Sequence, residues 1–180
     1  MSKFDNEYKK LFDDYFNRQE KSYIEVFGYG PTMPYDENID SEFYTSKPND
    51  DNEAEWKPIK ISNVNWDKIE NSLGIVLNDE IKAFYGTYKF LELSGKIDNY
   101  EYNILNFGVD CELEDDIINR YYKNGFQELQ LFYIGYIESE TKLFYSNVNK
   151  KMYKHDEDLD VDIEEFEYSL SEILKKISGF

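Results

Sequence analysis

The sequence holds a single cysteine, Cys111, and a single histidine, His155, among 180 residues. One thiol cannot form an intramolecular disulfide or supply a multi-cysteine zinc or iron–sulfur site. Any mechanism that moves a proton through imidazole would depend on His155 alone, and its charged neighbours favour a solvated side chain. The two residues are far apart in sequence and nothing beside Cys111 would activate its thiol, so we expect no catalytic Cys–His pair.

Phosphate-binding and nucleophile motifs are also missing. The chain has no G-x-x-x-x-G-K loop, no G-x-G-x-x-G turn and no G-x-S-x-G elbow. Arginine, which binds phosphate with a planar fork of donors, occurs only as Arg18 and Arg120. We therefore expect no enzyme activity, no cofactor, no bound metal and no small-molecule substrate.

Long apolar runs are absent as well. The first five residues lack the basic and apolar stretches of a secretory signal, and no run approaches the roughly 18 apolar residues that span a bilayer. Together with the lone cysteine, this predicts a cytoplasmic protein in a reducing compartment, without membrane insertion.

Positive charge is scarce. Lysine and arginine number 20 against 38 aspartates and glutamates, which gives a formal net charge of -18. A protein that binds nucleic acid gains affinity by neutralising phosphates with a basic face, and this chain would repel polyanions and anionic membrane surfaces. The charge excludes a nucleic-acid partner and favours a basic protein partner.

Aromatic residues, by contrast, are plentiful. Strongly charged chains of low hydropathy are often disordered, but such chains contain few aromatics, whereas 18% of this sequence is Phe, Trp or Tyr. We therefore expect a folded domain whose rings pack their faces in the core and leave their edges near water.

Hydrophobic periodicity predicts helices over 2–20, 66–73, 79–85, 112–124 and 163–177. Asn65 and Asn78 are expected helix caps, and Gly74 an expected helix end. Strands are expected over 88–94, 100–107, 129–137, 143–148 and 151–154, the first two forming a hairpin through a turn at 95–99. This order predicts an α+β fold, with a mostly antiparallel sheet flanked by helices and one domain spanning 1–180.

Residues 28–58 lack a sustained period and carry all four prolines and two of the nine glycines, so they are expected to form a long acidic connecting segment. Within it, 36–57 holds eight acids against Lys47 and Lys57. A solvated loop is the simplest interpretation of this stretch.

A second acidic run has no base within it. Acids in the first turn of a helix are stabilising, which accounts for two or three members of the run but not for five in seven residues. We therefore predict that these side chains form an exposed surface that binds a basic partner; they are Asp110, Glu112, Glu114, Asp115 and Asp116.

A third acidic stretch, 156–167, has the length and acid spacing of a calcium-binding EF-hand loop. The six candidate ligands are Asp156, Asp158, Asp160, Asp162, Glu164 and Glu167. However, Val161 occupies the place where the sharp turn requires glycine, and the preceding segment is expected to be a strand rather than a helix. A solvated approach to the last helix is the preferred interpretation, and calcium binding remains the alternative.

A family resemblance lies between residues 56 and 90. It is carried by Trp56, Pro58, Asn63-Val64-Asn65, Ile69, Leu73, Ile75-Val76, Ile81, Phe84-Tyr85, Thr87 and Phe90. These residues resemble the Syd family, a branch of the SUKH superfamily of small bacterial binding proteins. The opening aromatic helix, the Gly28-Tyr29-Gly30-Pro31 turn and the closing helix with Leu170 and Ile173 are also similar.

The resemblance implies binding without catalysis. The wider superfamily consists chiefly of immunity proteins that neutralise toxins, many of them nucleases, and the Syd branch interacts with basic cytosolic loops of the SecY translocon subunit. Either partner would be basic, in agreement with the charge. The second role would bring peripheral association with the inner membrane. Because 36–57 is long and acidic for the family, an immunity protein is favoured over a translocon factor.

Overall fold

The computed structural model describes residues 3–123, 129–156 and 163–177 of the chain. Its elements in chain order are α1 (Lys3–Phe27), β1 (Thr32–Pro34), the 3-10 helix η1 (Ser41–Phe43), β2 (Glu53–Glu55), β3 (Ile59–Lys60), α2 (Trp66–Leu73), α3 (Asp79–Thr87), β4 (Tyr88–Lys89), β5 (Leu93–Ile97), β6 (Tyr100–Ile104), α4 (Leu113–Lys123), β7 (Leu131–Ile137), β8 (Thr141–Ser146), β9 (Met152–Asp156), β10 (Glu164–Glu165) and α5 (Leu170–Lys176).

The main sheet has six strands in the order β10-β9-β8-β7-β6-β5, and every neighbouring pair is antiparallel. Hairpins join β5 to β6, β7 to β8 and β8 to β9, and α4 is inserted between β6 and β7. The expected α+β fold with a mostly antiparallel sheet is therefore confirmed. Two short antiparallel pairs, β1 with β2 and β3 with β4, lie outside this sheet.

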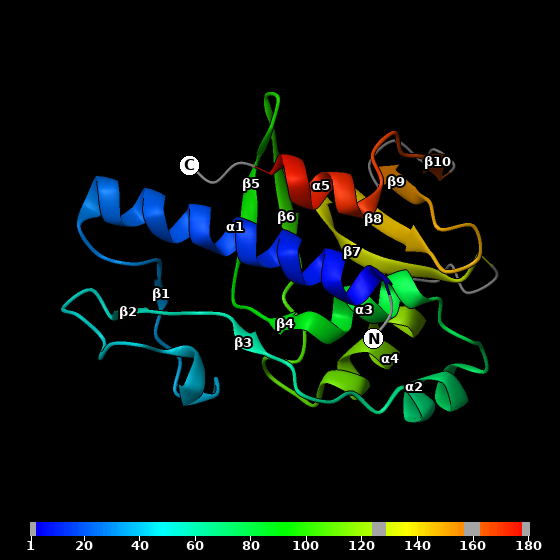
Figure 1. Cartoon of the computed structure of the whole chain (residues 1–180), viewed down its shortest axis with the longest axis horizontal. Helices are drawn as coiled ribbons and strands as arrows, with labels where there is room; N and C mark the ends of the chain where they lie inside the picture. Colours follow the sequence, from blue (N-terminus) through cyan, green and yellow to red (C-terminus); the bar gives the residue numbers. More distant parts are fainter. Residues whose placement is uncertain (1–2, 124–128, 157–162, 178–180) are drawn as a thin grey trace.

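Helix α1 organises the core. It runs across one face of the sheet beside α5 (Figure 1). Its apolar stripe is buried, and Phe12 packs its ring against Phe84 of α3 and against Phe90. Tyr8 extends the same stripe and donates a hydrogen bond of 2.8 Å to buried Glu80, which fixes α1 to α3. The helix continues seven residues beyond the expected end at residue 20 and stops before Gly28, whose φ of +83° favours glycine.

The expected helix signals at α2 and α3 are confirmed. The Asn65 side chain accepts from the backbone N–H of Lys68, and Gly74 ends α2 in the left-handed conformation. The Asn78 side chain caps α3 by accepting from the N–H groups of Glu80 and Ile81. A short polar side chain at each start supplies the acceptor that the first helical N–H groups lack.

The expected strand over 88–94 is wrong in its bounds. Tyr88 and Lys89 form β4 with β3, and the main-sheet strand β5 begins only at Leu93. The expected turn at 95–99 is correspondingly too long, because Gly95 is already paired with Tyr102. The hairpin itself is confirmed. Its turn is Asp98-Asn99, with Asp98 at a positive φ of 55° that a short polar side chain tolerates.

The closing helix is shorter than the expected 163–177. Glu164 and Glu165 pair with β9 as an edge strand, and α5 starts at Leu170. Ser169 sets this start through a capping box in which its side chain accepts from the Glu172 N–H and the Glu172 carboxylate accepts from the Ser169 N–H. The apolar periodicity in the sequence extends upstream of Ser169, but α5 begins only after this cap.

Residues 28–58 form a folded lobe rather than an irregular loop; we call them the acidic lobe. Strands β1 and β2 pair within it, and Tyr44 forms an isolated bridge with Trp56. Phe43 and Trp56 are 1% and 4% exposed, so the lobe has buried apolar anchors. Trp56 and Phe16 of α1 meet edge to face, which joins the lobe to the core.

Candidate functional site

The acidic run of residues 110–116 lies at the start of α4, next to α2. Asp110, Glu112 and Asp115 are exposed, whereas Glu114 and Asp116 are half-buried. The expectation that the whole run is exposed is therefore wrong for two of its five acids.

Asp116 is tied to the body of the protein. One carboxylate oxygen accepts from the backbone N–H of Gly108 at 2.8 Å, and the other accepts from Arg120 Nε at 2.7 Å. Only 15% of its side chain and 21% of that of Arg120 are exposed. This carboxylate closes the turn that leads into α4.

Glu114 and Asp115 attach α4 to α2. Glu114 Oε1 accepts from the backbone N–H of Asn65, the residue that caps α2, and Asp115 Oδ1 lies 2.6 Å from Lys68 Nζ. The hydrogen bond from Lys68 to Asp115 raises the pKa of the ammonium group, and the charges of Glu114 and Glu112 act in the same direction. These acids therefore hold two helices together as well as contributing negative charge.

Asp110 and Glu112 are the members that point to solvent without a side-chain partner among the described residues. Between them lies Cys111. Its pKa is raised by partial burial and by the charges of Asp116 and Asp110. A thiol that resists ionisation is a poor nucleophile, so Cys111 does not have the environment of an activated cysteine.

Acids in the acidic lobe also serve its turns. Asp36 accepts from the backbone N–H of Asn38, and Asp40 accepts from that of Glu42 at the start of η1. Glu55 accepts from the N–H of Gly30 at 3.1 Å. Glu37 and Asp50 are exposed and have no side-chain partner in the described chain.

The candidate calcium loop is only partly visible. Asp158, Asp160 and Asp162 lie outside the described residues. Glu164 lies in β10 beside Lys154, with 3.4 Å between its carboxylate and Nζ, and its neighbour Glu165 pairs with Lys151 at 2.7 Å. Within the described ranges, no group of three or more His, Cys, Asp or Glu side chains could hold a metal ion. His155, expected to be solvated, is half-buried in β9.

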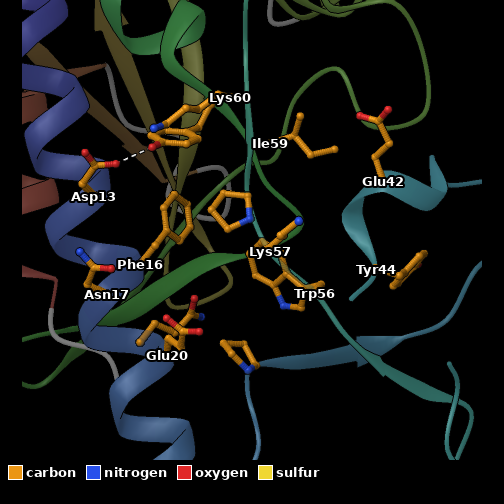
Figure 2. A pocket seen from close by; sticks show the side chains of 14 residues that line it. Asp13, Phe16, Asn17, Glu20, Glu42, Tyr44, Trp56, Lys57, Ile59 and Lys60 are labelled. Carbon is orange, nitrogen blue, oxygen red and sulfur yellow. Dashed lines mark hydrogen bonds between the residues drawn. The ribbon is translucent and has the colours of Figure 1, made fainter. Parts of the chain in front are cut away.

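A hollow of about 840 Å³ separates α1 from the acidic lobe. Figure 2 shows Asp13, Asn17 and Glu20 on the α1 side facing Glu42 and Tyr44, with Trp56 between the two sides. Lys57 and Lys60 also line this hollow. Three carboxylates and two ammonium groups therefore surround a space large enough for several side chains of a partner.

Two buried donors line this hollow without acceptors. Gln19 is 2% exposed and Trp56 is 4% exposed. In the described structure neither Gln19 Nε2 nor Trp56 Nε1 has a hydrogen-bond partner. Buried polar groups are nearly always paired, because an unpaired one loses its water without replacement.

A second hollow of about 370 Å³ adjoins the first at Lys60 and Tyr88. Its lining includes Lys9, Lys60 and Lys82 with one carboxylate, Asp5, and it has an apolar wall formed by Trp66. Lys82 also pairs with Glu70 at 2.7 Å. In a chain of charge -18 this is a locally basic place.

The importance of Gln19 was missed from the sequence, although a signal was present. Gln19 follows Tyr8, Leu11, Phe12, Tyr15 and Phe16 on the buried stripe of α1, so a polar side chain occupies an apolar position. Trp56 was noted only for its family resemblance. Its unpaired N–H depends on the position of the acidic lobe, which no local pattern encodes.

Among the described residues, the side chains that could bind a partner thus lie on the surface of an acidic α+β domain, at residues 110–116 and around the two hollows. None of the helices in the described residues is long and apolar enough to cross a membrane. The family model of the Syd protein (SUKH-2) matches residues 6–143, and the chain therefore belongs to the Syd family. No curated protein matches it. Membership fits a non-catalytic binding or immunity protein.

Proposed function

We propose that this chain is an immunity protein that binds a basic toxin domain through its acidic surface and thereby neutralises it. The observation that carries the proposal is the concentration of exposed carboxylates on a Syd-family fold. The net charge of -18 attracts basic proteins over long distances, and such steering raises the association rate and rejects acidic competitors.

Asp110 and Glu112 are the residues of the predicted surface that are best suited to this contact. They are exposed and form no ion pair with the described residues, so a partner can bind them without breaking the α2–α4 contact. Asp115 can contribute at the edge, because half of its side chain is exposed beside Lys68. Glu114 and Asp116 act in binding only through their charge.

The alternative is a peripheral factor that binds basic cytosolic loops of SecY. Its support is the family model itself, which is that of the Syd protein and extends through the acidic run to residue 143. The long acidic lobe favours a specialised toxin partner instead.

The test uses a toxin domain encoded beside the gene of this chain, with its affinity measured by calorimetry at 50 and 200 mM NaCl. The variant pair Asp110→Asn with Glu112→Gln should weaken binding at least tenfold at the lower salt concentration. The control pair Glu37→Gln with Asp50→Asn changes the net charge equally at other exposed acids and should cost less than threefold.

Equal losses in the two pairs would show that net charge alone acts and that 110–116 is not the contact. No binding of the wild-type chain at 50 mM NaCl would overturn the immunity function. Recovery of the chain on inverted membrane vesicles only when SecY is present would support the alternative.

A further inference from the structure

The two hollows adjoin along α1, where the hydroxyl of Tyr88 donates a hydrogen bond to Asp13, and together we call them the groove. Both are lined by Lys60 and Tyr88, and α1 supplies side chains to each. These side chains follow one stripe of the helix, from Asp5 and Lys9 in the second hollow to Glu20 in the first. Fifteen residues of helix rise about 22 Å, the length of an extended segment of about seven residues.

Two unpaired donors lie in the wall of the first hollow, each removed from solvent. Gln19 Nε2 and Trp56 Nε1 are buried at its wall and lack acceptors among the described residues. An extended peptide offers a backbone carbonyl at every residue, so it supplies acceptors at a regular spacing whatever its side chains are. A backbone carbonyl bound at the first hollow would supply the acceptor that each donor lacks once its side chain turns toward the hollow.

Strand β3 offers a backbone edge. Ile59 pairs with Lys89 and Lys60 with Tyr88, and the Ile61 N–H donates to the Thr87 carbonyl. Because bonded and non-bonded pairs alternate in an antiparallel ladder, the N–H and C=O of Lys60 point away from β4. These two groups have no hydrogen-bond partner among the described residues, so a further strand could add to this edge.

The groove differs in charge between its ends. The first hollow has Asp13, Glu20 and Glu42 against Lys57 and the shared Lys60. The second has Lys9 and Lys82, beside the shared Lys60, against Asp5; Lys82 is also paired with Glu70, whereas Lys9 has no partner among the described residues. A bound segment with a basic side chain at the first hollow and an acidic one at the second is attracted at both ends. A uniformly basic segment is attracted only at the first hollow.

We propose that the groove along α1 binds an extended segment of about seven residues of the basic partner, with a basic side chain at the Glu20–Glu42 end and a carboxylate at the Lys9–Lys82 end. This rests on the proposed protein-binding function. The net charge attracts any basic protein, and the groove selects among them by the order of charges on one segment.

The test is a selection of displayed heptapeptides on the purified chain and on a charge-swapped variant, Lys9→Glu with Glu20→Lys. The swap leaves the net charge at -18, and both side chains are exposed without partners among the described residues. Peptides enriched on the wild type should carry a base and an acid at opposite ends. They should bind the swapped variant at least tenfold more weakly, and its own selection should yield the reverse order.

A separate NMR measurement tests where on the chain the heptapeptide binds. The chain contains two tryptophans, and each lines one hollow: Trp56 the first and Trp66 the second. In a ¹⁵N–¹H spectrum, the indole signals of both should move when an enriched heptapeptide is added. A peptide that moves neither signal binds elsewhere and overturns the proposal.

The proposed function and the groove can fail separately. Uniformly basic peptides that bind both proteins equally, and lose affinity in salt, would overturn the groove but leave the acidic surface as the partner site. Charge-ordered peptides that move both indole signals, together with a toxin domain that does not bind, would retain the groove and overturn the immunity function.

Discussion

Gln19 occupies a position that an apolar side chain would fill on the buried stripe of α1. Its amide nitrogen has no acceptor in the described chain, and the side chain is almost wholly removed from water. The free energy of unfolding is lowered by such a group, because desolvating an unpaired amide costs about 1–3 kcal/mol. A polar side chain that lowers stability at such a position is expected where its amide binds a partner.

Gln19→Met should therefore stabilise the protein by about 1 kcal/mol, since methionine has a similar shape and no polar atoms to satisfy. Urea unfolding followed by tryptophan fluorescence measures this change. The control is Asn17→Met on the exposed side of the same helix, which should change stability by less than about 0.5 kcal/mol. A loss of stability in Gln19→Met would show that the amide is paired in solution.

Glu70 makes a contribution to the free energy of unfolding that depends on pH. Burial raises the pKa of its carboxyl, but hydrogen bonds from Lys82 and from the Leu77 N–H, together with the Lys82 charge, more than offset this and hold the pKa below its usual value of 4.5. A carboxyl with a lowered folded pKa stabilises the fold above its unfolded pKa. That contribution is lost as pH falls through the folded value.

Glu70→Gln should accordingly cost about 1 kcal/mol at pH 7, and the difference from wild type should shrink once the pH falls below 4.5. Thermal unfolding from pH 3 to pH 8 measures it. Glu140→Gln, at an exposed acid between β7 and β8, should show no such dependence. A constant difference between Glu70→Gln and wild type over this range would contradict the ion-pair explanation.

At the scale of elements, the outer strand β5 is protected by α1. The buried hydroxyl of Tyr15 donates to the Ser94 carbonyl at 2.7 Å and accepts from the Ser94 N–H at 3.0 Å. The Tyr15 hydroxyl thus pairs with both backbone groups of Ser94 on β5, the strand at the open edge of the sheet (Figure 1). An unprotected edge of this kind is a template for pairing with another chain.

Tyr15→Phe should lower the free energy of unfolding by about 2 kcal/mol, because it leaves two buried backbone groups without partners. It should also increase concentration-dependent association through β5, measured by light scattering. Tyr100→Phe, at a tyrosine that is 59% exposed, should be neutral in both measurements. A Tyr15→Phe protein that is destabilised but remains strictly monomeric would show that Tyr15 is not what prevents association through β5.

The sequence predicted elements well where a local signal decided them. Asn65 and Gly74 fixed both ends of α2, and Asn78 fixed the start of α3, because caps act on neighbouring backbone groups. Prediction failed at 88–94, where one apolar run divides between two sheets, and at 163–169, where β9 recruits two residues as a strand. In both cases long-range pairing overrides the local period.

The candidate surface was predicted less completely, for the same reason. The excess of acids at 110–116 is plain in the sequence, but the partners of Glu114 and Asp115 come from α2, more than forty residues earlier. Only the tertiary contact separates the acids that hold helices from Asp110 and Glu112, which remain available. The groove along α1 likewise depends on where the acidic lobe packs.

At the scale of the whole molecule, negative charge is gathered rather than evenly spread. Residues 36–57, 110–116 and 156–167 hold 21 of the 38 acids and two of the 20 bases. Like charges within each group repel one another. The exposed ion pairs, such as Lys21–Glu25 with both side chains more than 60% exposed, offset little of this repulsion.

Salt should therefore stabilise the fold while weakening its complexes. Between 10 mM and 0.15 M NaCl the Debye length falls from about 30 Å to about 8 Å, which screens repulsion between the acidic groups. A gain of about 1 kcal/mol would raise the melting temperature by about 3 °C in a protein of this size. Calorimetry at both salt concentrations measures it, and a melting temperature that falls would show that ion pairs such as Lys68–Asp115 outweigh the repulsion. The same screening slows the encounter with a basic partner, so stability and association rate should respond to salt with opposite signs.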